Sequence, residues 1–545
     1  DVDREAEALD ILGLAQQSRG ELDQALATWQ REAAVLDDEV ARHPDDPAAS
    51  KRRRLRADVD LALGQVHQTR GQTEAAIAAY DAAIAAYDRM FEAAPDDDDV
   101  ALGVARAHDK LGELHRAHGR IDLALAQHRQ GLAARERAAT HRKGDRDIVY
   151  ALSESHHKLG IAYLGAGASK QTLEELRTSA RLRASLVDAD PENTAWQAGL
   201  AQVEIELAGF QRQIGELDES VNTYRATLPI LEALVRRDPS NTGWRRDRGN
   251  LLSDLGFALV DEGDPKGALE RFAQAIANHT ELLMVAPDNA SWQVDLSRMH
   301  TRAGDAYRNA GDVAGALAAY ERGRAIREQL LKTDPKNEIW RRSVAWSYHK
   351  IAGALAIRND KGDLAGAIAA QEQALAIRSE LAHASTDHAG LQDELALSQV
   401  VLGDLYLRAG KPDRALALLD AGITSQQALV DADPVNGQWK QALVRGLIAR
   451  GELYRARGDV ALARADLERA VAAAGAAAMK APTNAEWQSQ LALAHWGLAQ
   501  SLRVGKDADG KRATAEAALA RDIFARLARA GRLAAELALV AAQIR

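Results

Sequence analysis

Apolar residues recur at helical spacing in segments that each begin with a tryptophan. Counted from that tryptophan, the apolar positions fall at +4, +7 and +11, as in Trp196, Leu200, Val203 and Leu207. This spacing places the four side chains on one stripe of a helix. The pattern therefore predicts an amphipathic helix, called helix A, after each such tryptophan.

The same short motif precedes six of the nine tryptophans. Each copy has a proline and an asparagine shortly before the tryptophan, as in DPENTAW (190–196) and APTNAEW (481–487). Proline is tolerated in the first turn of a helix, and a short polar side chain can cap the free N–H groups there. The motif thus marks the start of helix A at Trp196, Trp244, Trp292, Trp340, Trp439 and Trp487.

A second column of residues marks where helix A packs and where it ends. A small residue recurs once per unit, and a loop glycine usually follows it seven residues later, as with Gly304 and Gly311. A small residue lets two helices approach closely, and glycine adopts the left-handed conformation that closes a helix. We therefore predict that a helix B of about 20 residues runs back against helix A. The small column is Gly13, Gly64, Gly112, Gly160, Ala208, Gly256, Gly304, Ala352, Gly403, Gly451 and Ala499.

These columns divide nearly the whole chain into eleven units with a period of 48 residues. Three extra residues lie in the loop around 359–362. We expect one continuous array without β-sheet, in which each unit contacts mainly its neighbours. The predicted boundaries are 1–46, 47–94, 95–142, 143–190, 191–238, 239–286, 287–334, 335–385, 386–433, 434–481 and 482–545, the last with a C-terminal capping helix.

The columns resemble the tetratricopeptide repeat. LGDLYLRAGKPDRALALL (402–419) and RGELYRARGDVALARADL (450–467) show its pattern of small, aromatic and loop-glycine positions, and helix B at 364–378 is similar to kinesin-light-chain repeats. That family's repeat has 34 residues. The surplus here divides into two insertions of about seven residues, or two helical turns, one for each helix. The resemblance implies an all-α, right-handed α-solenoid (superhelix) of about eleven antiparallel helix pairs.

Composition agrees with an all-α chain and excludes several classes of protein. Aromatic residues make up only 4%, which argues against a β-sandwich or barrel. No apolar window is long enough to span a membrane. The absence of cysteine excludes disulfides and thiolate zinc sites, and the net charge of −10 opposes nucleic acid as the main partner. We expect a cytoplasmic location, with the periplasm as the alternative. The start at Asp1 rather than Met is consistent with a fragment or a processed product.

No motif indicates catalysis, so we predict no catalytic residue, cofactor or metal. The strongest metal candidate is a set of histidines in two neighbouring units, but His115 stands where other units have tyrosine, which favours packing. Asp96 to Asp99 occupy a helix start, where carboxylates favour the helix dipole. Basic runs at 51–56, 245–248 and 341–342 are read as solvated helix faces, with an anion-docking patch as the alternative. The histidines are His108, His115, His118, His156 and His157.

The resemblance implies that a concave wall is built from helix A, by the residues six and three before the small column and one and four after it. We call these positions the A-helix stripe, and we expect them to form a largely charged groove. They are Arg106, Asp109, Glu113 and Arg116; Arg298, Thr301, Asp305 and Arg308; Trp346 and His349; and Arg445, Ile448, Glu452 and Arg455.

Two roles are predicted for tryptophan. The six tryptophans of the motif begin the apolar stripe of helix A, and we expect them to be mostly buried. Trp346 instead points inward by its phase, and it is predicted to be a contact residue, with packing between adjacent A helices as the alternative.

The predicted function is a non-enzymatic scaffold that binds a protein or peptide in the helix-lined groove. The main alternative is a ligand-sensing region of a larger bacterial signalling protein whose effector domain lies outside this chain, and an enzyme with a new kind of site is a third. We expect neither nucleic acid binding nor membrane insertion. The sequence does not indicate an oligomeric state.

Overall fold

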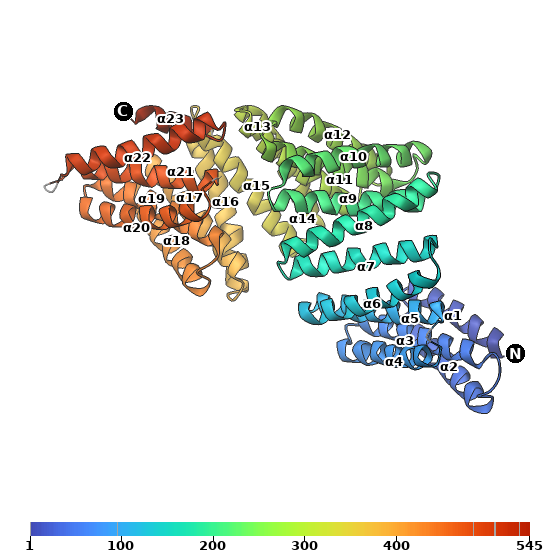
Figure 1. Ribbon diagram of the computed structural model, residues 1–545. Coiled ribbons are helices and arrows are strands. Elements are labelled where there is room, and N and C mark those ends of the chain that lie inside the picture. The colour runs from blue at the N-terminus through green and yellow to red at the C-terminus, as the bar shows by residue number, and fades with distance from the viewer. Residues whose placement is uncertain (1, 95, 483, 506–507, 534, 545) are drawn as a thin grey trace. The chain divides into compact units, whose positions relative to one another are not determined.

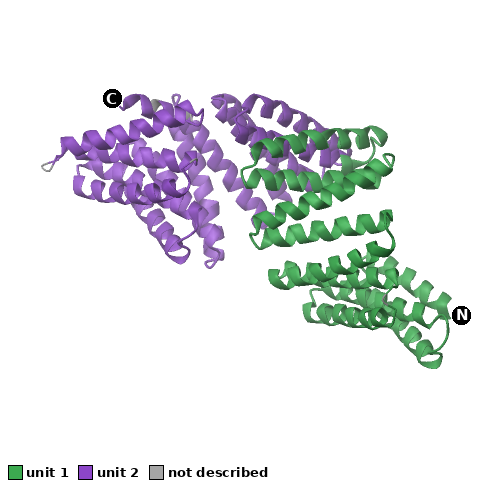
Figure 2. Cartoon of the chain, in the orientation of Figure 1, with its two compact units in different colours: residues 1–244 green, residues 245–545 purple. Residues whose placement is uncertain are grey.

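The computed structural model describes residues 2–94, 96–482, 484–505, 508–533 and 535–544, and all regular elements in these ranges are helices (Figure 1). The chain divides into two compact units, residues 1–244 and 245–545 (Figure 2). The first unit holds α1 (Val2–Ser18), α2 (Leu22–Arg42), α3 (Ala49–Thr69), α4 (Thr73–Ala93), α5 (Asp98–Ala117), α6 (Ile121–His141), α7 (Arg146–Gly165), α8 (Ser169–Ala189), α9 (Thr194–Gln213) and α10 (Leu217–Arg237).

The boundary between the units falls within α11 (Thr242–Glu262). The second unit continues with α12 (Pro265–Val285), α13 (Ala290–Asn309), α14 (Val313–Thr333), α15 (Glu338–Arg358), α16 (Asp363–Ala384), α17 (Ala389–Arg408), α18 (Pro412–Ala432), α19 (Gly437–Arg457), α20 (Val460–Lys480), α21 (Ala485–Leu502), α22 (Gly510–Arg529) and α23 (Ala535–Gln543).

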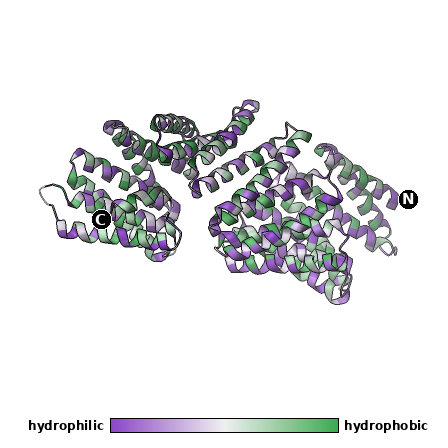
Figure 3. Cartoon of the chain, turned by 90° about the horizontal axis from the view of Figure 1, so that it is seen from above, coloured by the Kyte–Doolittle hydropathy of each residue, from purple (hydrophilic) through white to green (hydrophobic). Residues whose placement is uncertain are grey.

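The helices form consecutive antiparallel pairs, an odd-numbered helix A followed by an even-numbered helix B. The predicted α-solenoid of about eleven pairs is thereby confirmed, and α23 follows the last pair. Hydrophobic and hydrophilic residues alternate along the helices, as packing on one face requires (Figure 3). Every described helix is too short or too polar to span a bilayer. The hand of the superhelix and the single continuous array stay predictions.

Asparagine caps helix A wherever the tryptophan motif occurs, as predicted. The side-chain oxygen of each asparagine accepts a hydrogen bond from the backbone N–H of the tryptophan three residues later, at 3.0–3.2 Å. This bond satisfies one of the free N–H groups in the first helical turn. Asp97, Asp145 and His388 cap the corresponding helices in units without the motif.

The loop glycines close helix A, also as predicted. Gly119 has a φ of 71°, its N–H donates to the carbonyl of Arg116, and the next N–H, from Arg120, donates to the carbonyl of His115. These two bonds define a Schellman cap, which needs a left-handed residue at this position. The loop glycines of all the remaining repeats, from Gly20 to Gly458, also have a positive φ.

The small column allows helix B to lie close against helix A. A Cβ placed on Gly304 would come within 2.4 Å of Cε1 of Tyr320, and one on Gly64 would meet the ring of Tyr80 at the same distance. Each contact joins residues 16 positions apart. The aromatic or leucine column of helix B therefore packs directly onto the small column of helix A.

Within each unit, α1 to α10 and α12 to α22 pack mainly against the helices next to them in the sequence. The A helices of successive repeats also touch one another, from α1 to α7 in the first unit and from α17 to α21 in the second. In these two stretches, a repeat therefore shares an interface with the next through both of its helices.

The three extra residues between α15 and α16 form a closed loop. Asn359 has a φ of 54° and Gly362 a φ of 94°. The Arg358 guanidinium donates two hydrogen bonds to the Asp363 carboxylate, at 2.8 and 2.6 Å, across the base of the loop. This ion pair joins the last residue of α15 to the first residue of α16.

All six motif tryptophans have most of their surface buried, as expected, but to different degrees. Trp292 and Trp487 are buried, with 9% and 6% of their surface exposed, but Trp196, Trp244 and Trp340, like Trp439, are only half-buried. All six residues lie in the first turn of helix A. In the first unit, for example, the Arg146 guanidinium covers Trp196 at 5.8 Å from the ring centroid.

Candidate binding surface

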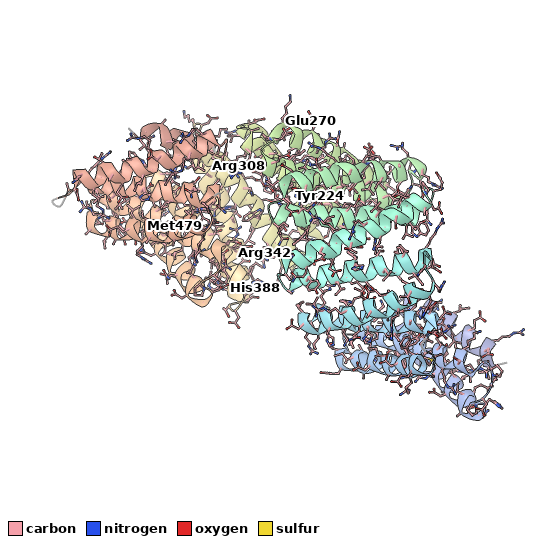
Figure 4. All side chains as sticks on the ribbon, viewed as in Figure 1. Tyr224, Glu270, Arg308, Arg342, His388 and Met479 are labelled. Carbon is pink, nitrogen blue, oxygen red and sulfur yellow. The ribbon has the colours of Figure 1, made fainter. Side chains whose placement is uncertain are left out.

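The residues of the A-helix stripe lie on α5, α13, α15 and α19, and their exposure depends on the position within the stripe. The first position is exposed in Arg106, Arg298, Trp346 and Arg445. The second is buried in Asp109, Thr301 and Ile448 and half-buried in His349. The third is half-buried in Glu113, Asp305 and Glu452, and the fourth is exposed in Arg116 but half-buried in Arg308 and Arg455 (Figure 4 labels Arg308).

Asp109 does not line an accessible surface, contrary to the prediction. Its side chain is 1% exposed and lies 3.1 Å from His128 Nδ1, 2.8 Å from Arg135 Nη1 and 3.1 Å from Lys158 Nζ. Burial alone would raise the pKa of Asp109, but the hydrogen bond to His128 and the charges of Arg135 and Lys158 hold it below its usual value. Asp109 is therefore a structural charge that joins α5, α6 and α7.

Several charges of the stripe pair with the A helix of a neighbouring repeat. In the first unit, Arg106 contacts Asp58 at 2.8 Å and Lys158 contacts Glu113 at 2.9 Å. In the second unit, the distances are 2.8 Å for Lys350 to Asp305 and 3.2 Å for Arg445 to Glu486. Arg342 and Glu394, which lie outside the stripe, form a similar pair at 2.6 Å (Arg342 is labelled in Figure 4). These ion pairs link successive A helices. Much of the charge predicted for the groove is therefore neutralised by partners within the protein.

Trp346 differs from the other tryptophans in its exposure. Of the nine tryptophans, all of them described, it is the most exposed, with 37% of its residue surface accessible. His349 stacks on the ring with centroids 5.2 Å apart, and Lys350 Nζ and Arg378 Cζ lie 5.5 and 5.4 Å from its centroid. Trp346, His349, Lys350 and Arg378 form what we call the tryptophan cluster.

Arg378 is a buried cation with few partners. Its side chain is 1% exposed, and Nη1 donates to Ser398 Oγ and to the carbonyl of Glu394, whereas Nε and Nη2 have no hydrogen-bond partner. Glu394 Oε2 forms an ion pair with Arg378 at 3.8 Å from Nε. Burial lowers the pKa of Arg378 to about 10 despite the charge of Glu394. The guanidinium next to Trp346 thus has a carboxylate counterion but two nitrogens without a hydrogen bond.

The same positive field acts on His349. Burial, together with the charges of Arg378, Lys350 and Arg445, lowers its pKa to about 3, although Gln371 Oε1 accepts a hydrogen bond from His349 Nδ1 at 3.2 Å. His349 is therefore neutral at physiological pH.

Two carboxylates lie on α17 and α19, two A helices of the second compact unit. Asp404 on α17 and Glu452 on α19 follow the small column by one residue, and both are half-buried. Burial and the charge of Asp404 raise the pKa of Glu452 to about 7, and burial likewise raises the pKa of Asp404. Arg455 and Arg408 oppose these shifts only in part. We call Asp404 and Glu452 the carboxylate pair.

The candidate histidines point to separate partners. His108 Nδ1 lies 2.6 Å from Gln127, His118 Nδ1 lies 2.9 Å from the carbonyl of Leu114, and His156 and His157 contact Glu175 and Glu206. His115 is buried, and burial lowers its pKa. The described residues contain no cluster of three or more histidine or carboxylate side chains suited to a metal ion.

Sequence reasoning missed Arg378 and the carboxylate Asp404. Asp404 follows Gly403 of the small column by one residue, which is a position of the stripe. The sequence could therefore have identified it. The signal for Arg378 is a serine 20 residues later. Arg135, Arg327 and Arg378 on helix B each donate to the hydroxyl of such a serine on the next helix A, namely Ser155, Ser347 and Ser398.

No protein-family model and no curated protein matches the sequence. Solved structures with a similar arrangement include BtubC (BKLC) from P. vanneervenii, which is 20% identical and has a TM-score of 0.37 over 47% of this chain and 92% of its own. A putative kinesin light chain with TPR-like repeats from Podosopora anserina is 17% identical, with a TM-score of 0.33 over 42% of this chain and 96% of its own.

A signal transduction ATPase with a tetratricopeptide repeat sensor, from Pyrococcus horikoshii, is 11% identical and has a TM-score of 0.42 over 76% of this chain and 55% of its own. The structural basis for classifying the repeat lies in the chain itself. Its hairpins combine a capped helix A, a glycine turn, and a small column that receives the aromatic column of helix B. The chain is built from tetratricopeptide-like helical repeats with an extended unit of 48 residues.

Proposed function

We propose that this chain is a non-enzymatic interaction scaffold that binds an extended segment of a protein or peptide along the A helices of its second unit. The observation that supports the proposal is the exposed ring of Trp346 on the A-helix stripe. An exposed tryptophan offers a large apolar contact area at low cost in side-chain entropy, and tryptophan is enriched among residues that dominate binding energy.

The surroundings of Trp346 favour a contact role. Its ring is held by His349, Lys350 and Arg378, so that the exposed face is presented in a fixed orientation. A preorganised contact residue loses less freedom on binding than a mobile one. The alternative of a ligand-sensing region and the cytoplasmic location stay predictions.

The test is a selection of random linear peptides on the full chain, followed by affinity measurements with the enriched peptides. Trp346→Ala is expected to weaken binding by at least about tenfold with little change in melting temperature. Trp340→Ala, in the same helix but half-buried, is the matched control and is expected to lower the melting temperature more than the affinity. Failure to enrich any peptide, or unchanged affinity in folded Trp346→Ala, would contradict the proposal.

A further inference from the structure

We infer that one face of α1 is a docking site for an amphipathic helix of another protein, which takes the place that a preceding helix B takes in the later repeats. The face consists of Ala8, Ile11, Leu12 and Ala15, and we call it the open face of α1. It lies on a different compact unit from the tryptophan cluster of α15, so the inference goes beyond the proposed function.

The open face of α1 is apolar and exposed. Its two large residues, Ile11 and Leu12, have 61% and 43% of their surface accessible, and both of its alanines are exposed as well. Their spacing of i, i+3, i+4 and i+7 places the four residues on one stripe of the helix. Gly13 lies on another stripe, which is buried against Trp29 of α2. α1 thus has two apolar stripes, and only one of them is covered by the part of the chain that the structure describes.

The same positions are buried in the later repeats. Counted from the small column, Ala8, Leu12 and Ala15 stand at −5, −1 and +2. In each of the ten later repeats the residues at −5 and +2 are buried, and the residue at −1 is buried in eight repeats and half-buried in two. The leucines at −1 show the contrast directly, since Leu12 is 43% exposed whereas Leu111 and Leu159 are 2% exposed. α1 therefore exposes a surface that the other A helices bury.

The side chains that cover these positions come from the preceding helix B. In the first unit, Tyr80 of α4 shares an apolar cluster with Leu111 and Leu114 of α5. In the second unit, Leu467 of α20 shares one with Leu498 of α21. The open face of α1 presents the same columns and so continues an interface that recurs along the chain. A helix with the leucine or aromatic stripe of a helix B therefore fits it.

A second copy of the chain does not offer such a helix at its other end. In α22, the last helix B, Phe524 and Leu527 share an apolar cluster with Trp496 of α21 and with Ile544, which follows α23. A head-to-tail contact between two copies would first have to displace α23 from this cluster. For this reason we assign the occupant of the open face to a different polypeptide.

The probe is a labelled synthetic peptide with the sequence of α20, residues 460–480. We choose α20 because it packs on α21, where the residues at −5 and −1, Ala494 and Leu498, are of the same type as Ala8 and Leu12. Fluorescence anisotropy in a titration with the full chain measures the affinity. We expect saturable binding with a Kd in the micromolar range, and a peptide carrying Leu467→Glu should bind at least about tenfold more weakly.

Leu12→Ser tests whether the peptide binds to α1. Because Leu12 is exposed, the variant should keep the melting temperature of the wild type, whereas its affinity for the peptide is expected to fall at least about tenfold. Leu123→Ser is the matched control, since Leu123 is 49% exposed on α6, a helix B of the same unit, and it should bind like the wild type. Loss of affinity in both variants, or in neither, would contradict the assignment to α1.

Sedimentation velocity of the same proteins distinguishes a partner helix from a second copy. A monomeric wild-type chain that binds the peptide supports the inference. A dimer that Leu12→Ser dissociates would show that a second copy covers the open face, and it would overturn the inference, as would the absence of peptide binding. Trp346→Ala should bind the α20 peptide like the wild type, so the outcome is independent of the proposed function.

Discussion

Single residues at the helix A to helix B contact set the distance between the two helices. Gly304 lies against the ring of Tyr320, and an added Cβ would come within 2.4 Å of it. Because Tyr320 is 2% exposed, its ring has little room to move. The packing of this pair therefore depends on the absence of a side chain at residue 304.

Gly304→Ala is accordingly expected to destabilise the protein by about 1–3 kcal/mol, because overpacking shifts the ring or the backbone. Gly353→Ala is the matched control, since an added Cβ there meets no atom within 4 Å and alanine favours a helix by about 0.5–1 kcal/mol. Denaturant unfolding of both variants measures the effect. Equal stability of the two would contradict the close-contact interpretation.

Glu452 is expected to make the free energy of unfolding fall as the pH rises. Its pKa in the folded chain is raised from its ordinary 4.5 to about 7, so the folded state binds the proton more tightly than the unfolded state. Stability from this group is therefore present at low pH and is lost as the pH rises from 4.5 towards 7. Glu452→Gln removes this loss.

The difference in melting temperature between Glu452→Gln and the wild type is thus expected to become more positive between about pH 5 and pH 8. The lowered pKa values of His300 and His349 act in the opposite direction but are common to both proteins, so they cancel in the comparison. A difference that stays constant with pH would show that Glu452 titrates normally.

At the scale of the helical elements, buried arginines join each helix B to the following helix A. Arg327 on α14 donates to Ser347 on α15 at 2.6 Å and to Ser297 Oγ on α13 at 3.2 Å. Burial and the charge of Arg298 lower the pKa of Arg327 to about 10. Because this guanidinium is buried, each of its hydrogen bonds is costly to lose.

Ser347→Ala is therefore expected to cost about 1.5–3 kcal/mol, the range for a hydrogen bond to a charged group. Ser343→Ala, one turn earlier in α15, removes a hydroxyl that bonds only within its own helix, to the carbonyl of Ile339. It should change stability by less than about 0.5 kcal/mol. Thermal and denaturant unfolding of the two variants would distinguish the stability that comes from the hydrogen bond between α14 and α15 from the stability that comes from a hydroxyl bonded within α15.

The elements themselves were largely predictable from the sequence, because their signals are local. The asparagine caps and the glycine turns depend on residues within a few positions of each helix end. The site was less predictable. Asp109 is buried because Lys158, 49 residues away, and two side chains of α6 converge on it, and no local pattern reports such a meeting.

At the scale of the whole molecule, stability is distributed along the chain by contacts between neighbouring repeats. A helix packs mainly against its sequence neighbours, and the A helices add contacts between adjacent repeats. In such arrays the free energy is close to a sum of repeat and interface contributions. A change in one repeat should therefore be felt nearby and fade with distance.

Trp292→Ala provides the test of this behaviour. Removal of the buried ring is expected to cost about 3–5 kcal/mol and to speed hydrogen exchange in α12 to α15. Exchange in α3 to α5 should stay as in the wild type. Uniformly faster exchange along the chain would show instead that the repeats unfold as one cooperative body.

The loop between α15 and α16 shows how such a chain can change its length. The Arg358 and Asp363 side chains fix both ends of the hairpin, while residues 359–362 between them are exposed and extend it by three residues relative to the other turns. Since the helices on either side keep their contacts, a few residues can be gained or lost here without shifting any interface. Elsewhere along the chain, a change in length that preserves every interface between helices has to add or remove a whole repeat.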